Sequence, residues 1–136
     1  MSRRSEQRRA AAFALYQSDL TGRSLTDTLP RDASLFTRAL AHAADDLQDE
    51  LDGTIARHAE GWTIDRIAPL EKAIMRTALL EMLHPDAVPA DEPIPAEGAI
   101  DEAVETAKRY AGAQAPGFVN GILNAALRET RQNQPR

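Results

Sequence analysis

Apolar residues recur every three or four positions along most of this chain, which is the spacing of one face of an α-helix. The pattern is clearest in the last third, where two such rows are separated by a short interruption. Gly112 stands after the first row as a helix stop, and Pro116 has the position of the first residue of the next helix. Residues 99–127 therefore predict two helices joined by a loop. The two rows consist of Ile100, Ala103, Val104 and Ala107, and of Val119, Ile122, Leu123 and Ala126.

The same spacing predicts further helices upstream, separated by turn residues. Leu20 is expected on the buried side of the first helix, which Gly22 ends. Trp62 follows Gly61 at a helix junction, where we expect it to fill a gap in the core. Four prolines exclude a helix from residues 84–98. The remaining predictions are helices over about 3–20, 33–59 and 69–83, a loop or short helix over 23–32, and a frayed tail after residue 128.

Composition narrows the class of protein. The chain has 136 residues and no cysteine, which fits one domain with a single core and excludes disulfides and thiolate zinc sites. β-branched residues never alternate as they do in strands, so the predicted fold class is all-α. No apolar run reaches the roughly 18 residues that a membrane span needs. We expect a cytoplasmic protein, because a chain without cysteine suits a reducing compartment.

Charge is distributed unevenly along the chain. The net charge is −5, yet residues 1–9 carry +3, residues 128–136 carry +2, and the region between them carries −10. An acidic chain is not expected to coat nucleic acid with its whole surface. If the fold brings the two basic ends together, they form one local surface for binding anions.

Two clusters of residues suggest contact with RNA. Positive charge in the first turn of a helix opposes the helix dipole, so four arginines there indicate either a solvated, frayed turn or a phosphate-binding surface. The second cluster is the start of the last predicted helix, where an aromatic residue, an amide and a glycine stand together. The candidates are Arg3, Arg4, Arg8 and Arg9 for phosphates, and Phe118 and Asn120, next to Gly121, for bases.

Catalytic and metal-binding patterns are missing from the sequence. It contains no nucleophile–base pair, glycine-rich phosphate loop or metal-ligand spacing, so we expect neither an enzyme nor a cofactor. Carboxylates are frequent between residues 45 and 52, but they lack the glycine-bearing spacing of a calcium loop and predict a solvated acidic face. Lys72 and Arg76 are spaced as a pair on a helix surface.

Three segments resemble the NusB family of transcription antitermination factors. They are RRAAAFALYQSDLTG at residues 8–22, WTIDRIAPLEKAIMRTALLEML at 62–83, and IPAEGAIDEAVETAKRYAGAQAPGFVNGIL at 94–123. The pieces EAVETAK and FVNG are the most specific, and the segments follow one another in the family's order. The sequence departs from the family pattern at Gly117, where a lysine is frequent, and at Leu80, where an aromatic residue is common.

The resemblance implies a single-domain bundle of about seven helices in two packed subdomains. It also implies a non-enzymatic antitermination factor that binds single-stranded boxA RNA from ribosomal RNA operon transcripts, together with ribosomal protein NusE, in the RNA polymerase antitermination complex. Tyr16, Arg76 and Glu81 are carried over as the surface that faces NusE. If one RNA strand touches both clusters, Arg4 and Arg8 must lie near Phe118.

A different class of function is open at the level of sequence. The chain could form a homodimer or larger homo-oligomer that acts as a helical protein-interaction adaptor without RNA. Such a dimer would cover the arginine-rich helix. Binding of boxA RNA that weakens as salt rises separates the two hypotheses.

Overall fold

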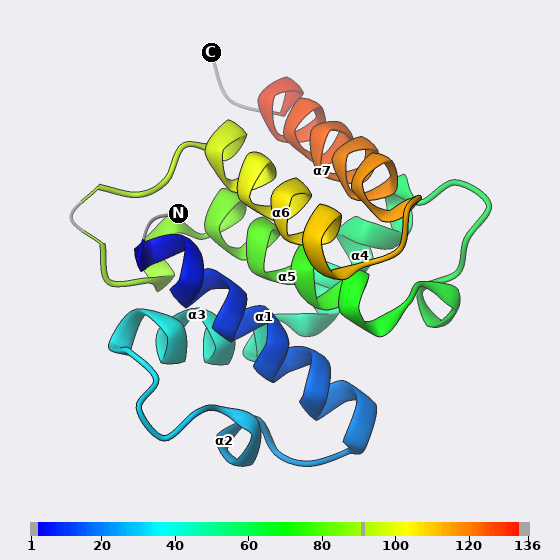
Figure 1. The fold of residues 1–136 in the computed structure, drawn as a ribbon. Helices are drawn as coiled ribbons and strands as arrows, with labels where there is room; N and C mark the ends of the chain where they lie inside the picture. Colours follow the sequence, from blue (N-terminus) through cyan, green and yellow to red (C-terminus); the bar gives the residue numbers. More distant parts are fainter. Residues whose placement is uncertain (1–2, 91, 134–136) are drawn as a thin grey trace.

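Seven α-helices and two short 3₁₀ turns make up the described residues, 3–90 and 92–133, of the computed structural model (Figure 1). This confirms the predicted all-α class and the number of helices. The helices are α1 (Arg3–Thr21), α2 (Leu25–Thr28), α3 (Leu35–Asp46), α4 (Gln48–His58), α5 (Pro69–Leu83), α6 (Ala96–Tyr110) and α7 (Ala115–Gln132). The 3₁₀ turns η1 and η2 cover Ile64–Arg66 and Pro85–Ala87.

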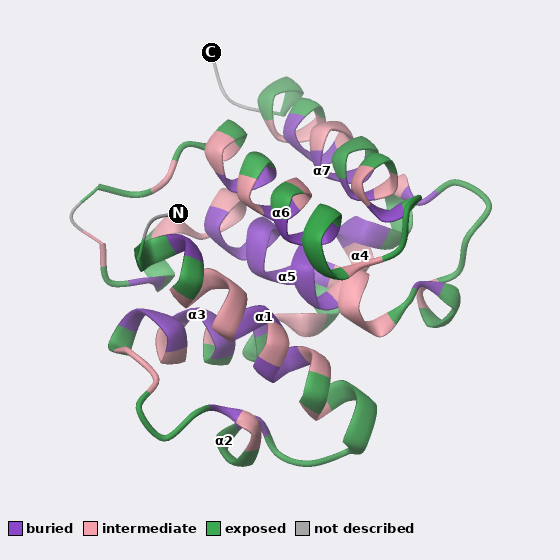
Figure 2. Cartoon of the chain, viewed as in Figure 1, coloured by how far each residue is buried: buried purple, intermediate pink, exposed green. Residues whose placement is uncertain are grey.

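Helix α5 is the centre of the bundle. Every residue from Ala73 to Glu81 is buried, so this helix lacks a solvent-facing side over more than two turns (Figure 2). Helices α1 and α3 pack on one side of α5, and α4, α6 and α7 pack on the other. The two groups of helices are therefore joined through α5, whose Ile74, Met75 and Leu79 are almost fully buried.

The predicted helix over 33–59 is wrong in one respect, because it is two helices. α3 ends at Asp46 and α4 begins at Gln48, with Leu47 between them at φ −101° and ψ 19°. The break lets buried residues of both halves, such as Leu40 and Leu51, pack into the same core. Gly53, the residue expected to loosen the helix, lies inside α4.

Several smaller expectations are also corrected. Leu20 is 59% exposed because it lies in the last turn of α1, and Trp62 is 53% exposed and does not fill the core. Residues 23–32 contain the short helix α2, which agrees with the prediction, whereas α7 continues past residue 128 to Gln132, where a frayed tail is predicted. The proline-rich segment holds η2, and α6 already begins at Ala96. In the described part of the chain, no helix is both long and apolar enough to cross a membrane.

Candidate nucleic-acid interface

One exposed arginine of the first turn of α1 lies against an aromatic ring. The guanidinium carbon of Arg4 is 4.1 Å from the ring centre of Phe36, a buried residue of α3. Arg4 also donates a hydrogen bond to Oε1 of Gln7 at 2.8 Å. Arg3 and Arg4 are both exposed. Stacking and the hydrogen bond hold the guanidinium of Arg4 in place while leaving it accessible to an anion.

Arg8 has a different environment, although it lies one turn further along the same helix. Its Nε and Nη2 donate to the two carboxylate oxygens of Glu81 at 2.6 and 3.0 Å. The side chain of Arg8 is 14% exposed and that of Glu81 is 3% exposed. A guanidinium that binds a buried carboxylate with both arms is already neutralised, and releasing it would leave Glu81 buried and unpaired. The predicted phosphate contact of Arg8 thus competes with an ion pair that joins α1 to α5.

Arg9 lines a narrow cleft between α1 and α6. The cleft also contains the carboxylates of Asp101, Glu102 and Glu105, and Glu102 accepts a hydrogen bond from the hydroxyl of Ser5 at 2.6 Å. Arg9 is half-buried, and the neighbouring α6 surface is acidic. Of the four predicted arginines, Arg3 and Arg4 consequently offer the most exposed positive charge.

The first turn of α1 and the last turn of α7 both contact the N-terminal half of α6. Ser5 of α1 contacts Glu102 in the middle of α6, and Arg131 of α7 pairs with Glu97 about one and a half turns earlier on α6. The anion-binding surface expected from the charge distribution is thus compatible with the fold. Arg136 lies outside the described residues.

The predicted base-contacting residues lie in the first turns of α7. Phe118 is half-buried and meets Trp62 edge to face, with ring centres 6.1 Å apart and an interplanar angle of 68°. Asn120 is exposed, and its backbone oxygen and Oδ1 both accept hydrogen bonds from Nδ2 of Asn124 at 2.9 Å. The side-chain amide nitrogen of Asn120 is therefore the polar atom of this residue that is most available to a ligand.

The two clusters do not converge. Arg8 contacts Glu81, which lies in the last turn of α5. Phe118 of α7 lines a pocket together with Glu71, which lies in the first turn of α5. Ten residues of helix separate Glu71 from Glu81, which is about 15 Å along the axis. The prediction that Arg4 and Arg8 lie near Phe118 is wrong, because α5 and α6 stand between α1 and α7 (Figure 1).

The residues predicted to face a protein partner are mostly inside the fold. Arg76 is 3% exposed and donates to both carboxylate oxygens of Asp52 at 2.7 and 2.8 Å, so it is not a helix-surface charge. Asp19 of α1 lies 3.7 Å from the same guanidinium and 3.8 Å from the ammonium of Lys72. Arg76 therefore joins α1, α4 and α5.

Burial also limits what the other two candidates present at the surface. Glu81 is occupied by Arg8, and Tyr16 is half-buried against the core. A partner could touch part of Tyr16 but little of Arg76 or Glu81. The predicted partner surface therefore rests mainly on Tyr16.

Two aromatic residues near the proposed contacts were missed from sequence. Phe36 fits the apolar spacing of the helix predicted over 33–59, and nothing local indicates that two arginines from another helix lie over its ring. Trp62 was placed in the core because large aromatic residues at helix junctions are usually buried. Among the described residues, no group of three or more His, Asp or Glu side chains is arranged to hold a metal ion.

Comparisons with known proteins agree with the fold and with the family resemblance. Residues 5–128 match the NusB family. The transcription antitermination protein NusB of Rubrobacter xylanophilus is 35% identical over 132 residues, which cover 93% of this chain and 90% of that protein.

Solved structures give the same result. NusB of T. maritima superimposes with a TM-score of 0.81 at 28% identity, covering 94% of this chain and 92% of that one. A chain from a crystal structure of antitermination factors NusB and NusE in complex with dsRNA has a TM-score of 0.78 at 26% identity, covering 95% and 99% of the two chains.

Proposed function

Because this chain belongs to the NusB family, we propose that it is an antitermination factor that binds boxA RNA of ribosomal RNA operon transcripts together with ribosomal protein NusE. The structural relative that contains NusB, NusE and dsRNA supports RNA and NusE as partners. In this proposal the RNA–protein complex acts on RNA polymerase, and the protein itself performs no chemical reaction.

The observation that carries the proposal is the exposed guanidinium of Arg4, held 4.1 Å over the ring of Phe36. A long cationic side chain normally loses rotamer entropy when it binds a phosphate. Stacking removes part of that loss before the ligand arrives, and Arg3 adds a second exposed charge beside it. Phosphate contacts position an RNA strand, and they make its affinity depend on salt.

The base contacts are assigned to Phe118 and Asn120, which α5 and α6 separate from the arginines of α1. The two clusters therefore do not form one continuous RNA path, and we assign them as two separate RNA contacts. Arg9 belongs to the contact on α1, beside the acidic surface of α6.

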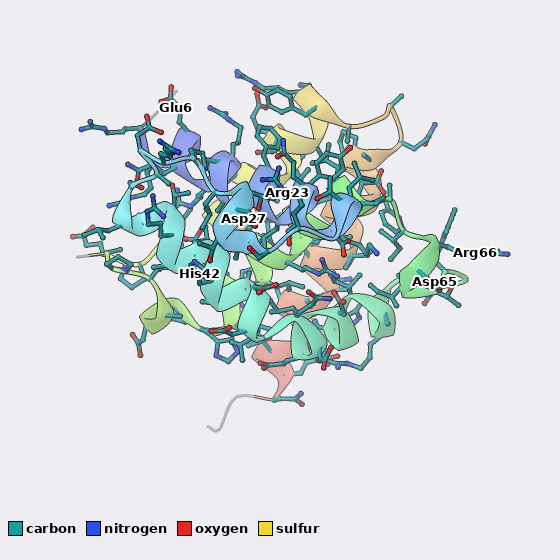
Figure 3. The ribbon with its side chains drawn as sticks, turned by 90° about the horizontal axis from the view of Figure 1, so that it is seen from below. Glu6, Arg23, Asp27, His42, Asp65 and Arg66 are labelled. Carbon is teal, nitrogen blue, oxygen red and sulfur yellow. The ribbon has the colours of Figure 1, made fainter. Side chains whose placement is uncertain are left out.

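The test is a titration of fluorescein-labelled single-stranded boxA RNA, with and without NusE, for the wild type and the Arg4→Glu variant. Charge reversal at Arg4 should weaken binding about 10-fold or more and reduce the slope of log Kd against log salt by about one or two phosphate contacts. Arg23→Glu, which reverses an exposed arginine on the loop after α1, is the matched control (Figure 3).

Equal affinities for the wild type and the Arg4→Glu variant would contradict the assignment of the first turn of α1. If boxA RNA does not bind either with or without NusE, the antitermination proposal fails and the homo-oligomeric adaptor is favoured. Sedimentation of the same samples then shows whether a homodimer exists.

A further inference from the structure

A pocket at the start of α5 is lined by side chains from two stretches that are distant in sequence, residues 62–71 and 114–118. Trp62 and Arg66 come from the segment around η1, Glu71 comes from α5, and Gln114 and Phe118 come from the start of α7. Its volume is about 260 Å³. This is slightly below the range of pockets that hold drug-sized ligands and suits a smaller planar group.

Two aromatic rings form one wall of the pocket. Trp62 is the only tryptophan of the chain, and 53% of it is exposed to solvent. Its contact with Phe118 is edge to face, which leaves a large part of the indole face uncovered. An indole exposed at the rim of a pocket, with a second ring fixing its position, is a platform on which a flat ring can stack.

The polar groups of the pocket have unused hydrogen-bonding capacity. The carboxylate of Glu71 makes no hydrogen bond or ion pair within residues 3–90 and 92–133, and burial raises its pKa. A partly buried carboxylate without a donor is costly, so a ligand that supplies N–H donors is favoured there. The exposed amide of Gln114 provides one more donor and one more acceptor.

Arg66 places a positive charge at the rim of the pocket. Its side chain is exposed and extends outward from the loop next to Asp65, as Figure 3 shows. The carboxylate of Asp65 is engaged by the hydroxyl of Thr63, which lowers its pKa. The positive charge of Arg66 at the rim is available to the phosphate that adjoins a base bound in the pocket.

We propose that this pocket binds one unpaired RNA base that carries an exocyclic amino group. The base stacks on Trp62, its amino group donates to the carboxylate of Glu71, and the adjacent phosphate lies near Arg66. Uracil lacks the amino group and binds less tightly. This inference rests on the proposed RNA-binding function and adds to it a base preference and the residues Trp62, Arg66 and Glu71.

The experiment uses the full chain and two 12-nucleotide RNAs, oligocytidylate and oligouridylate. Emission from Trp62 reports directly on the pocket, since no other tryptophan contributes. Fluorescence anisotropy of labelled RNA measures affinity for the wild type, Trp62→Ala, Trp62→Phe and Glu71→Leu, with Arg23→Gln as the control. Circular dichroism verifies that each variant is folded.

The expected results concern the wild type first and then each variant. Oligocytidylate quenches Trp62 emission and binds more tightly than oligouridylate. Trp62→Ala weakens binding of oligocytidylate about 5- to 100-fold, the range for loss of one base–aromatic stack. Trp62→Phe keeps most of the wild-type affinity, and Glu71→Leu removes the preference for cytosine. Arg23→Gln is expected to match the wild type throughout.

Other results would overturn the inference. If the wild type binds RNA without a change in Trp62 emission, and Trp62→Ala binds equally well, the pocket is not a base site while the proposed function stands. If NusE quenches Trp62 and RNA does not, the occupant is a protein side chain. If neither these RNAs nor boxA RNA bind, the proposed function fails together with the pocket.

Discussion

Removing the ion pair between Arg8 and Glu81 should destabilise the fold strongly. The loss of this pair should not by itself weaken RNA binding. The pair is bidentate, at 2.6 and 3.0 Å, and its side chains are 14% and 3% exposed. Breaking a buried pair by removing one partner costs about 3–5 kcal/mol, because the other charge is left without compensation. The total stability of a domain is only about 5–15 kcal/mol, so Arg8→Met and Glu81→Leu should each be serious lesions.

The double variant Arg8→Met/Glu81→Leu distinguishes the ion pair from simple packing. Replacing both partners by apolar residues leaves no unpaired charge, so the double variant should be much closer to the wild type than either single variant is. For a chain of this length, 1 kcal/mol corresponds to about 3–5 °C in Tm. Each single variant should therefore melt about 10–20 °C lower, and the double variant should regain most of that difference.

Urea unfolding followed by circular dichroism measures the four proteins, and a double-mutant cycle gives the coupling energy. If the free energy of unfolding of each single variant is within about 1 kcal/mol of that of the wild type, the reasoning from burial is refuted. RNA titration of the double variant provides the functional half of the experiment. If Arg8 is structural, affinity stays within about 2-fold of the wild type, whereas a loss of 10-fold or more would show that Arg8 contacts phosphate.

Two further predictions concern backbone strain and pH. Gly22→Ala should lower the free energy of unfolding, measured with urea, by about 1–2 kcal/mol, because φ is +75° at this position. Gly121→Ala should raise it by about 0.5–1 kcal/mol, because Gly121 lies inside α7 with open space around its Cα. Burial raises the pKa of Glu71, so its protonated form favours folding, and this contribution is lost as pH rises through the folded pKa. Glu71→Gln should consequently raise Tm more at pH 7 than at pH 4, and equal shifts at both pH values would contradict the effect of burial.

The positions of the main helices could be predicted because amphipathic spacing is a local property of the sequence. The apolar rows of α6 and α7 are buried as expected, except that Val104 is half-buried, and Gly22 ends α1 with the positive φ that a glycine adopts most easily. The break at Leu47 carries no such signal, because the apolar row continues across it. It becomes visible only when both halves are packed against α5.

The roles of charged residues were harder to predict than the helices, since they depend on distant partners. Arg76 and Asp52 are 24 positions apart, and Arg8 and Glu81 are 73 positions apart. Viewed along a single helix, each of these residues looks like an ordinary solvated charge. Their burial follows from the central place of α5, which receives helices on both sides and leaves Arg76 and Glu81 nowhere to reach solvent.

Arg4 and Arg8 show why this distinction affects the path of an RNA strand. Both guanidinium groups lie over the ring of Phe36, at 4.1 and 5.3 Å, yet only Arg4 lacks a buried carboxylate as partner. The positive surface of α1 is therefore confined to its first turn, and a strand that extends from it over α6 meets carboxylates there. Since the chain between its basic ends carries a charge of −10, repulsion along this path must be offset from outside the chain. A cationic partner protein that covers the strand would do so, which gives a physical reason for RNA and protein partner to bind together rather than separately.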